Sequence, residues 1–497
     1  METSASPAAA GREQFLDQVL NEAPVRSFWA ARHFPKLSIA AQVALDFLTV
    51  MAALGLAYAS YRVLELGTGV YYPPDLFLLT SAIVATGFVL LMERYELYHP
   101  SSSLLHIRET EAILRGTLWS TAVFVVTGYL FVYFLASRWM IALSCFLVFS
   151  LVSAQRAAFY AVLRRLHMQG YGLDRVLIFG CSPEGVQVFR KLVQSPRAGF
   201  VPVGFVDPDP TLRGKRIYEN SYTRRISLPV VGTGEELDQL LSRLHITRII
   251  LTDGAPTEGK HQRIFELCER HKVKISFVSP QHHMVQHAVN YLNLDGVMLA
   301  EIRAIEESKV YRVSKRLLDL VLGTLLLVIS APLLTFLSLL IWKADGRPAL
   351  FTQERVGQFG KIFRIFKFRT MYRDTPAYAP TPRSQEDARI TPVGRFLRRT
   401  SLDELPQLLN VLRGEMSLVG PRPEMPFIVA QYTPAQRERL IAKPGITGLW
   451  QISADRAFEI HENIEYDLYY IRNRSILLDL VILLHTLIFA IRGVGAF

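Results

Sequence analysis

Four long apolar segments near the start of the chain constrain its fold more than any other feature. They cover residues 41–62, 75–93, 112–135 and 138–162. Each is long enough to cross a hydrocarbon layer of about 30 Å as a helix. Hydrophobic residues make up 50% of the whole chain. We therefore predict a membrane protein that begins with a bundle of four transmembrane helices.

The charge of the chain indicates its partners and its orientation. The net charge is +11, which suits contact with anionic lipid and a polyanionic substrate. Nucleic acid is the other common partner of a basic chain, but the sequence has no nucleic-acid-binding motif, and we predict no such partner. Arginines follow the second segment and close the fourth, at Arg94, Arg108, Arg115, Arg156, Arg164 and Arg165. By the positive-inside rule, the tail of residues 1–40 and the end of the fourth helix are cytoplasmic.

One charged residue lies inside the first apolar segment. Asp46 is costly there unless it finds a partner or water. We expect it either near the membrane interface or paired between helices.

The region of residues 167–305 has the pattern of a soluble α/β domain. Strand-like runs lie at 175–180, 201–206, 246–252 and 273–278, with a helical run at 185–194. Strands that alternate with helices predict a parallel, doubly wound sheet of the Rossmann type. The first turn, Gly180-Cys-Ser-Pro-Glu-Gly185, departs from G-x-G-x-x-G. We therefore predict a degenerate Rossmann-like domain.

A further apolar run, Leu317–Trp342, is broken near its middle by Ser330 and Pro332. Both flanks are basic, whereas a spanning helix should have asymmetric flanks. We predict a re-entrant helix hairpin over 314–343 that enters one leaflet and returns, with Ser330 satisfying a backbone group freed by Pro332. A kinked helix that crosses the membrane is the alternative. Tyr311 and Lys315 have the spacing of short-chain dehydrogenases, which we interpret as coincidence at the threshold of this run.

The stretch from Arg398 to Pro426 contains two adjacent carboxylates, Asp403 and Glu404. Pro406 follows them, and proline is tolerated only in the first turn of a helix, so a helix must begin close to Asp403. Both carboxylates then face the positive end of the helix dipole, which lowers their pKa and keeps them ionised as a nucleophile or metal ligand must be. Ser401 and Glu404 also fit an ordinary capping box.

Basic residues lie on both sides of this pair in the sequence, and they form either a solvated face or a phosphate-binding face. Two aromatic and basic strands are expected at 351–357 and 363–371, and the second carries Lys367 and Arg369. Arg398 precedes the pair and Arg422 follows it in a Gly-Pro-Arg-Pro loop. A rigid turn, expected to line the site, contains Lys443, Gly445 and Gln451. The C-terminal apolar segment, 476–491, is short for a span and is expected to lie in the membrane interface.

These motifs together resemble one enzyme family. Residues 308–497 contain Lys315-Arg-x-x-Asp319, the Pro332 break, Lys367-Phe-Arg-Thr-Met371, the Asp403-Glu404 pair in Thr-Ser-Leu-Asp-Glu-Leu-Pro-Gln, the Gly-Pro-Arg-Pro loop and Lys443-Pro-Gly-Ile-Thr-Gly-Leu-Trp-Gln451. This set resembles the large monotopic class of polyprenyl-phosphate phosphoglycosyl transferases, which initiate bacterial exopolysaccharide and O-antigen synthesis. The four spans and the degenerate Rossmann-like domain resemble the N-terminal half of that class. One departure is Ser-Ala-Pro at the break, where Ser-Pro is familiar.

The resemblance implies a reaction and a site. The enzyme would transfer a sugar 1-phosphate, most simply of glucose or galactose, from a UDP-sugar to undecaprenyl phosphate in the bacterial inner membrane and release UMP. Asp403 would be the nucleophile, and Glu404 would hold Mg²⁺ with it or manage protons. Lys367, Arg369, Arg398 and Arg422 would bind phosphate, and the hairpin at Ser330 and Pro332 would seat the lipid carrier.

The predicted architecture is a multidomain membrane protein. It has a tail at 1–40, four transmembrane helices at 41–166, the Rossmann-like domain at 167–305 and an α+β catalytic domain at 306–497. The catalytic domain contains the re-entrant helix at 314–343. The long N-terminal half offers a surface for a homodimer. Two alternatives remain at this point: a membrane-bound nucleotide-sugar dehydratase or epimerase, and a non-catalytic scaffold of polysaccharide assembly.

Overall fold

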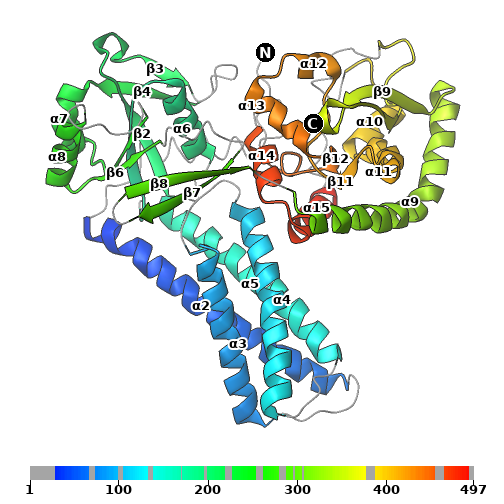
Figure 1. The fold of residues 1–497 in the computed structure, drawn as a ribbon, viewed down its shortest axis with the longest axis horizontal. Coiled ribbons are helices and arrows are strands. Elements are labelled where there is room, and N and C mark those ends of the chain that lie inside the picture. The colour runs from blue at the N-terminus through cyan, green and yellow to red at the C-terminus, as the bar shows by residue number, and fades with distance from the viewer. Residues whose placement is uncertain are drawn as a thin grey trace. The chain divides into compact units, whose positions relative to one another are not determined.

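The computed structural model divides the chain into two compact units, Met1–His282 and His283–Phe497, shown in Figure 1. It describes residues 28–65, 73–98, 105–132, 138–168, 171–194, 199–218, 226–252, 261–278, 287–294, 297–304, 307–376, 387–453 and 464–491. Most of the predicted tail and the middle of the polar stretch between residues 374 and 390 lie outside the described residues.

All four predicted N-terminal segments form helices. These are α2 (Phe28–Val63), α3 (Pro74–Arg94), α4 (Leu105–Val132) and α5 (Arg138–Met168). Residues 28–40 of the predicted tail belong to α2, and alanine, arginine and lysine there are good helix formers.

Four helices in the described chain are long and apolar enough to cross a membrane. They are Lys36–Val63, Pro74–Arg94, Arg138–His167 and Lys309–Asp345. The third predicted span, α4, is not among them over its described residues. Its first half carries Arg108, Glu109, Glu111 and Arg115.

A cluster of buried ion pairs joins helices α2, α4 and α5. Arg156 of α5 is 1% exposed and forms ion pairs with Asp46 of α2 and Glu109 of α4. Tyr98 donates a hydrogen bond of 2.9 Å to Asp46. The prediction that Asp46 pairs between helices is therefore confirmed. A buried carboxylate is tolerated only with such partners.

Removing the arginine should destabilise this bundle strongly. Arg156→Met leaves two buried carboxylates uncompensated, so we expect a loss of about 3–5 kcal/mol of stability. Arg115→Met is the matched control, because Arg115 pairs with Glu111 one turn away on its own helix and keeps 32% of its side chain exposed, so its loss should cost less than about 1 kcal/mol. Thermal unfolding of the purified protein in detergent checks both. Equal losses in the two variants would contradict the assignment.

The rest of the first unit is a doubly wound α/β domain. Its sheet has the order β3-β4-β2-β1-β5-β6, with β1 at Asp174–Phe179, β2 at Phe200–Val206, β3 at Arg216–Tyr218, β4 at Ser227–Gly232, β5 at Arg248–Leu251 and β6 at Lys274–Phe277. Only β3 is antiparallel to its neighbour. Helices α6 (Pro183–Gln194), α7 (Leu237–Arg243) and α8 (Gln262–His271) connect the strands. The Rossmann-type prediction is confirmed, but two strands were missed. β4 contains Pro229, which interrupts the strand pattern, and β3 is only three residues long.

The first turn of this domain is held by a hydrogen bond to a carboxylate and by close packing of its helix. The backbone N–H of Cys181 donates to Asp207 Oδ2 at 2.7 Å. In a dinucleotide-binding domain, a backbone N–H of this turn would donate to a phosphate, but here it donates to a carboxylate of the protein. A Cβ at Gly185 would lie 2.2 Å from the carbonyl oxygen of Gly180. The helix therefore packs directly on the turn.

The second unit is an α+β domain built on small sheets. Its strands are β7 (His287–Leu294), β8 (Val297–Ala304), β9 (Leu350–Val356), β10 (Ile362–Phe368), β11 (Ser417–Val419) and β12 (Gly445–Thr447). Its helices are α9 (Lys309–Asp345), α10 (Pro392–Arg399), α11 (Leu408–Arg413), α12 (Pro426–Ala430), α13 (Pro434–Arg437), α14 (Ile464–Arg472) and α15 (Ile476–Ile491). The two predicted basic strands pair antiparallel as β9 and β10. The β7–β8 hairpin belongs to this unit, although the sequence boundary put it in the α/β domain.

The predicted helix break within residues 314–343 is a bend in one continuous helix. Helix α9 runs without interruption from Lys309 to Asp345 with Pro332 inside it, and it first runs level and then turns upward in Figure 1. A proline inside a helix is a common cause of such a bend. Ser330 Oγ donates to the carbonyl of Leu327 at 3.3 Å, one residue before the carbonyl that Pro332 leaves without a donor. The helix therefore bends there without ending.

Both ends of α9 are fixed to the second unit, while its middle is exposed. Near the start, Asp319 accepts a hydrogen bond of 3.0 Å from Leu418 N in β11. Near the end, Leu337 and Ile341 are buried in one cluster with the β10 and α10 side chains. Between them, Val328 is 66% and Ile329 is 68% exposed.

Candidate functional site

The carboxylate pair lies on a short 3₁₀ helix that packs against β10. This helix, η6, covers Leu402–Gln407 and leads into α11. The capping-box prediction was wrong. Ser401 adopts a left-handed conformation with φ of 56° and makes no side-chain cap. The side chain of Glu404 contacts Lys367 and Arg422, which are distant in the sequence, and not the backbone N–H of Ser401. The single helix predicted from Asp403 is instead a 3₁₀ turn followed by α11.

Glu404 is tied to two cations from other elements. Its Oε1 lies 2.6 Å from Lys367 Nζ on β10 and 3.1 Å from Arg422 Nη2 in the loop after β11. Burial would raise the pKa of this carboxyl, but Arg422 and Lys367 together lower it to about 2. Glu404 is therefore ionised throughout the physiological range.

Asp403, the neighbouring residue, is in a different electrostatic state. Among the described residues, no side chain or backbone group hydrogen-bonds or ion-pairs with its carboxylate. Burial and the charge of Glu404 raise its pKa to about 6, against the opposing effect of Lys367, Arg398 and Arg422. The prediction that the helix dipole lowers the pKa of both carboxyls was wrong for Asp403, because a 3₁₀ turn supplies little dipole and burial prevails.

The structure brings some of the predicted cations to the pair and places others elsewhere. Lys367 and Arg422 contact Glu404 directly, and Arg398 lies close enough to Asp403 to affect it electrostatically while donating to Thr370 Oγ1 at 2.8 Å. Arg369 is committed to the end of α9, where it donates to the carbonyls of Asp345 and Gly346 at 2.7 and 2.6 Å. Its guanidinium therefore holds the end of α9 rather than pointing at the pair.

The turn predicted to line the site does so in part. A shallow cleft beside Glu404 is lined by Lys367, Gln407, Arg422 and Gly445. Gly445 is required by backbone packing, since a Cβ there would lie 2.1 Å from Gly420 N. Lys443 lies beside Arg316, and burial together with that like charge lowers its pKa. Gln451 donates weakly to the carbonyl of Ile446 at 3.5 Å, so neither Lys443 nor Gln451 is part of the cleft wall.

Two residues of the site were missed in the sequence. Arg355 of β9 lines the same cleft and donates to Gln353 Oε1 at 2.6 Å; its place in the alternating basic strand was the available signal. Arg439 is 2% exposed and donates to the carbonyl of Arg422 at 3.0 Å while pairing with Asp467 at 2.6 Å. Arg439 therefore fixes the backbone of the loop that presents Arg422.

The donor set suits a divalent cation bound with a substrate. No group of three or more His, Cys, Asp or Glu side chains suitable for a metal occurs in the described residues, so these residues form no all-protein cage. The carboxylate of Asp403 is unpaired among them, and both cations on Glu404 meet the same oxygen. Mg²⁺ is commonly held by one or two carboxylates together with substrate phosphates, and this pair fits that requirement.

Comparison with known proteins identifies the family. A model of the bacterial sugar transferase family matches residues 310–493, and a CoA-binding domain model matches residues 96–279. The undecaprenyl-phosphate galactose phosphotransferase of Salmonella typhimurium is 30% identical over 349 residues, 67% of this chain and 71% of that protein. The chain belongs to the polyprenyl-phosphate phosphoglycosyl transferases. It is therefore a sugar-phosphate transferase and not a scaffold alone.

Other relatives agree with this assignment. The UDP-glucose:undecaprenyl-phosphate glucose-1-phosphate transferase of Escherichia coli is 31% identical over 334 residues, 65% of this chain and 68% of that protein. The galactosyl transferase CpsE of Streptococcus agalactiae is 42% identical over 196 residues, 37% of this chain and 43% of that protein.

Among solved structures, the UDP-D-quinovosamine 4-dehydrogenase of Vibrio fischeri matches 26% of this chain and 93% of its own at 17% identity, with a TM-score of 0.18.

The different states of the two carboxyls predict the pH dependence of this transferase. If ionised Asp403 is required, kcat/KM for the sugar donor falls as the pH falls through about 6. Glu404→Gln removes a like charge and should move this acid limb to lower pH, whereas Lys367→Met removes a cation and should move it to higher pH. Rates measured between about pH 5 and pH 8 check the direction of each shift. A limb that stays in place in both variants would refute the assignment to Asp403.

Proposed function

We propose that this enzyme transfers a sugar 1-phosphate from a UDP-sugar to undecaprenyl phosphate and releases UMP. The relatives of Salmonella and Escherichia coli carry names that state undecaprenyl phosphate as acceptor, and the latter names UDP-glucose as donor. One observation supports placing the reaction at these residues. Glu404 is paired with two cations, whereas the adjacent Asp403 has no hydrogen-bond or ion-pair partner among the described residues. An unpaired, ionised carboxylate next to phosphate-binding cations suits attack on phosphorus.

In the proposed first step, a carboxylate oxygen of Asp403 attacks the phosphorus that bears the sugar. The bond between that phosphorus and the bridging oxygen of the diphosphate breaks, and the bridging oxygen leaves with UMP. In the second step, a phosphate oxygen of undecaprenyl phosphate attacks the same phosphorus. The bond to Asp403 then breaks and the free carboxylate returns.

The surrounding residues would bind and orient the diphosphate. Arg422 and Lys367 carry the positive charge nearest to the pair, and Arg398 adds a third cation close to Asp403. Arginine and lysine neutralise phosphate oxygens by charge-assisted hydrogen bonds. Asp403 and Glu404 would hold Mg²⁺ together with the substrate. When bound, the ion would supply further positive charge to the diphosphate.

Helix α9 would enter the membrane from the cytoplasmic side and return. Its start is held by β11 through Asp319 and its end by Arg369 on the strand extension after β10. The attachment of both ends to one domain, together with an apolar and exposed middle, supports a helix that returns to the side from which it entered. The proposed location is the bacterial inner membrane with the catalytic domain in the cytoplasm, where nucleotide sugars are made.

The proposed sugar is glucose or galactose, which the names of the relatives include. The reaction would be the first membrane step of exopolysaccharide or O-antigen synthesis. A panel of UDP-sugars tested for UMP release with undecaprenyl phosphate identifies the donor. Absence of UMP release with every member of the panel would overturn the proposed reaction.

Loss of the nucleophile should abolish the reaction. Asp403→Asn should lower UMP release by at least about 10³-fold, since removing a nucleophile removes the covalent route. The matched control is Asp374→Asn, an exposed aspartate outside the pair, which should keep the wild-type rate. UMP release in membranes with UDP-sugar and undecaprenyl phosphate gives both values.

Intact-protein mass after incubation with UDP-sugar and no acceptor gives an independent check. A sugar-phosphate adduct on wild type, and none on Asp403→Asn, is expected. Full activity in Asp403→Asn would instead assign the nucleophile to another group.

A further inference from the structure

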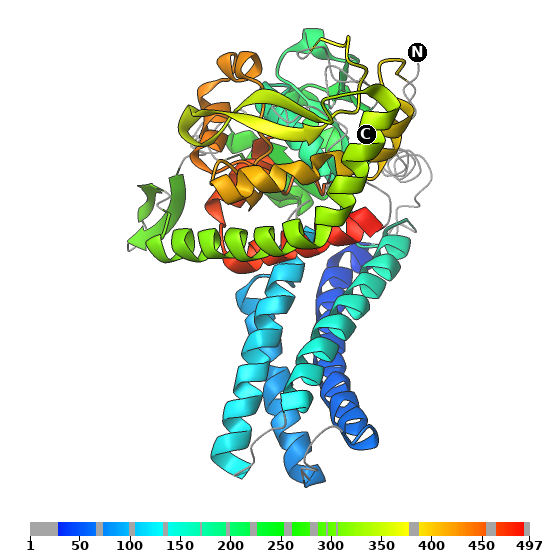
Figure 2. The same ribbon diagram turned by 90° about the vertical axis from the view of Figure 1, so that its right-hand side faces the viewer.

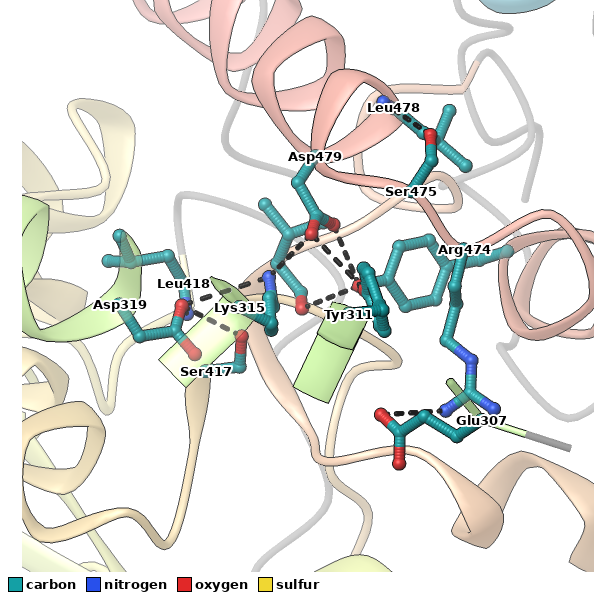
Figure 3. Close-up of polar contacts among 12 residues, drawn as sticks. Glu307, Tyr311, Lys315, Asp319, Ser417, Leu418, Arg474, Ser475, Leu478 and Asp479 are labelled. Carbon is teal, nitrogen blue, oxygen red and sulfur yellow. Dashed lines mark hydrogen bonds and ion pairs between the residues drawn. The ribbon is translucent and has the colours of Figure 1, made fainter. Parts of the chain in front are cut away.

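A carboxylate is fully buried in the apolar C-terminal helix. Asp479 of α15 is 0% exposed, and both its oxygens have partners (Figure 3). Tyr470 of α14 donates to Oδ1 at 2.8 Å. Tyr311 of α9 donates to Oδ2 at 3.2 Å, and Lys315 Nζ lies 3.1 Å from the same oxygen. A buried charge is stable only when it is satisfied in this way.

The α9 side of this contact is a single polar stripe. Tyr311, Lys315 and Asp319 are four residues apart, so they lie on one face of the helix. Asp319 Oδ1 accepts hydrogen bonds of 3.0 Å from both Ser417 Oγ and Leu418 N. Lys315 lies between the two carboxylates, at 3.7 Å from Asp319. The stripe therefore connects α15, α9 and β11.

The opposite face of α9 is apolar and exposed. Val310 is 75%, Val313 is 68% and Leu317 is 61% exposed. Helix α15 exposes Leu487 at 58%, and Figure 2 shows it running beside α9. In the proposed function, both exposed faces meet lipid. The buried stripe is thus the junction between the membrane-facing helices and the catalytic fold.

The junction reaches the site through β11. Tyr470 also donates to the carbonyl of Val419 at 3.1 Å, and β11 leads directly into the loop that presents Arg422 to Glu404. The cations that contact Glu404 have separate supports. Arg439 holds the backbone of Arg422, and Asn410 accepts from Phe366 N on β10 at 3.0 Å.

We propose that Asp479, acting through Lys315 and Tyr311, is a positioning residue that sets the seat of the lipid acceptor relative to Asp403. It fixes the positions of α9 and α15 relative to β11. The phosphate of the acceptor is thereby held in line with the phosphorus that it attacks. It makes no contact with the nucleotide sugar, whose cations have their own supports. Its loss therefore affects the second half-reaction and spares the first. This inference rests on the proposed function.

The test separates the two half-reactions in Asp479→Asn. We expect the apparent KM for undecaprenyl phosphate to rise about tenfold, while the rate and amount of adduct formed from UDP-sugar without acceptor stay within about twofold of wild type. The matched control is Thr486→Val, which removes a 2.7 Å hydroxyl contact between α15 and Thr447 of β12 but leaves the α9 junction. It should leave the KM for the acceptor unchanged.

Two further variants guard against a loss of folding. Tyr311→Phe keeps the ion pair and removes one donor, so it should raise the same KM by a smaller factor. If the two act as a unit, Lys315→Met combined with Asp479→Asn should raise the acceptor KM by clearly less than the product of the two single-variant factors.

An unchanged acceptor KM in Asp479→Asn and Tyr311→Phe would overturn the proposal. So would a parallel loss of adduct formation and acceptor transfer, which would indicate a merely structural role. Wild-type protein that neither forms adduct nor releases UMP would instead overturn the proposed reaction itself, so the two failures are distinguishable.

Discussion

The attachment of both ends of α9 to one domain is the constraint on which the rest of the second unit depends. Asp319 fixes the start of the helix to β11, and Arg369 caps its end. Much of the apolar middle between these points is exposed, as at Val328 and Ile329, and a bend at Pro332 lets one helix serve both attachments. A membrane element is thereby tied to two strands that carry the residues around Glu404.

The chemistry depends on a second asymmetry, between two adjacent carboxyls. Lys367 and Arg422 converge on Glu404 from different elements, and this takes up the charge that would otherwise pair with Asp403. Asp403 keeps an unpaired carboxylate in a place where burial raises its pKa. Two carboxyls that are adjacent in the sequence therefore differ in pKa and in pairing, because tertiary contacts treat them differently.

The sequence predicted much of this arrangement and failed where tertiary contacts decide. The strands that carry Lys367, the Rossmann-type sheet and the pairing of Asp46 follow from local patterns and burial cost. The capping box was wrong because Glu404 prefers two distant cations to a backbone N–H three residues away. Arg369 has the spacing of a phosphate ligand, yet its contact is the end of α9. Arg439 gave no local signal, since its partners lie in three separate segments.

The most direct test of the account is the sidedness of the two ends of α9. Single cysteines replacing Lys309 and Arg347, both exposed, in a background without Cys145, Cys181 and Cys268, are labelled with a membrane-impermeant thiol reagent. Glu65→Cys, after the first predicted span, is the control for the opposite side. The account predicts that both α9 positions react only from the cytoplasmic side and the control only from the other. Labelling of the two α9 positions from opposite sides would contradict it.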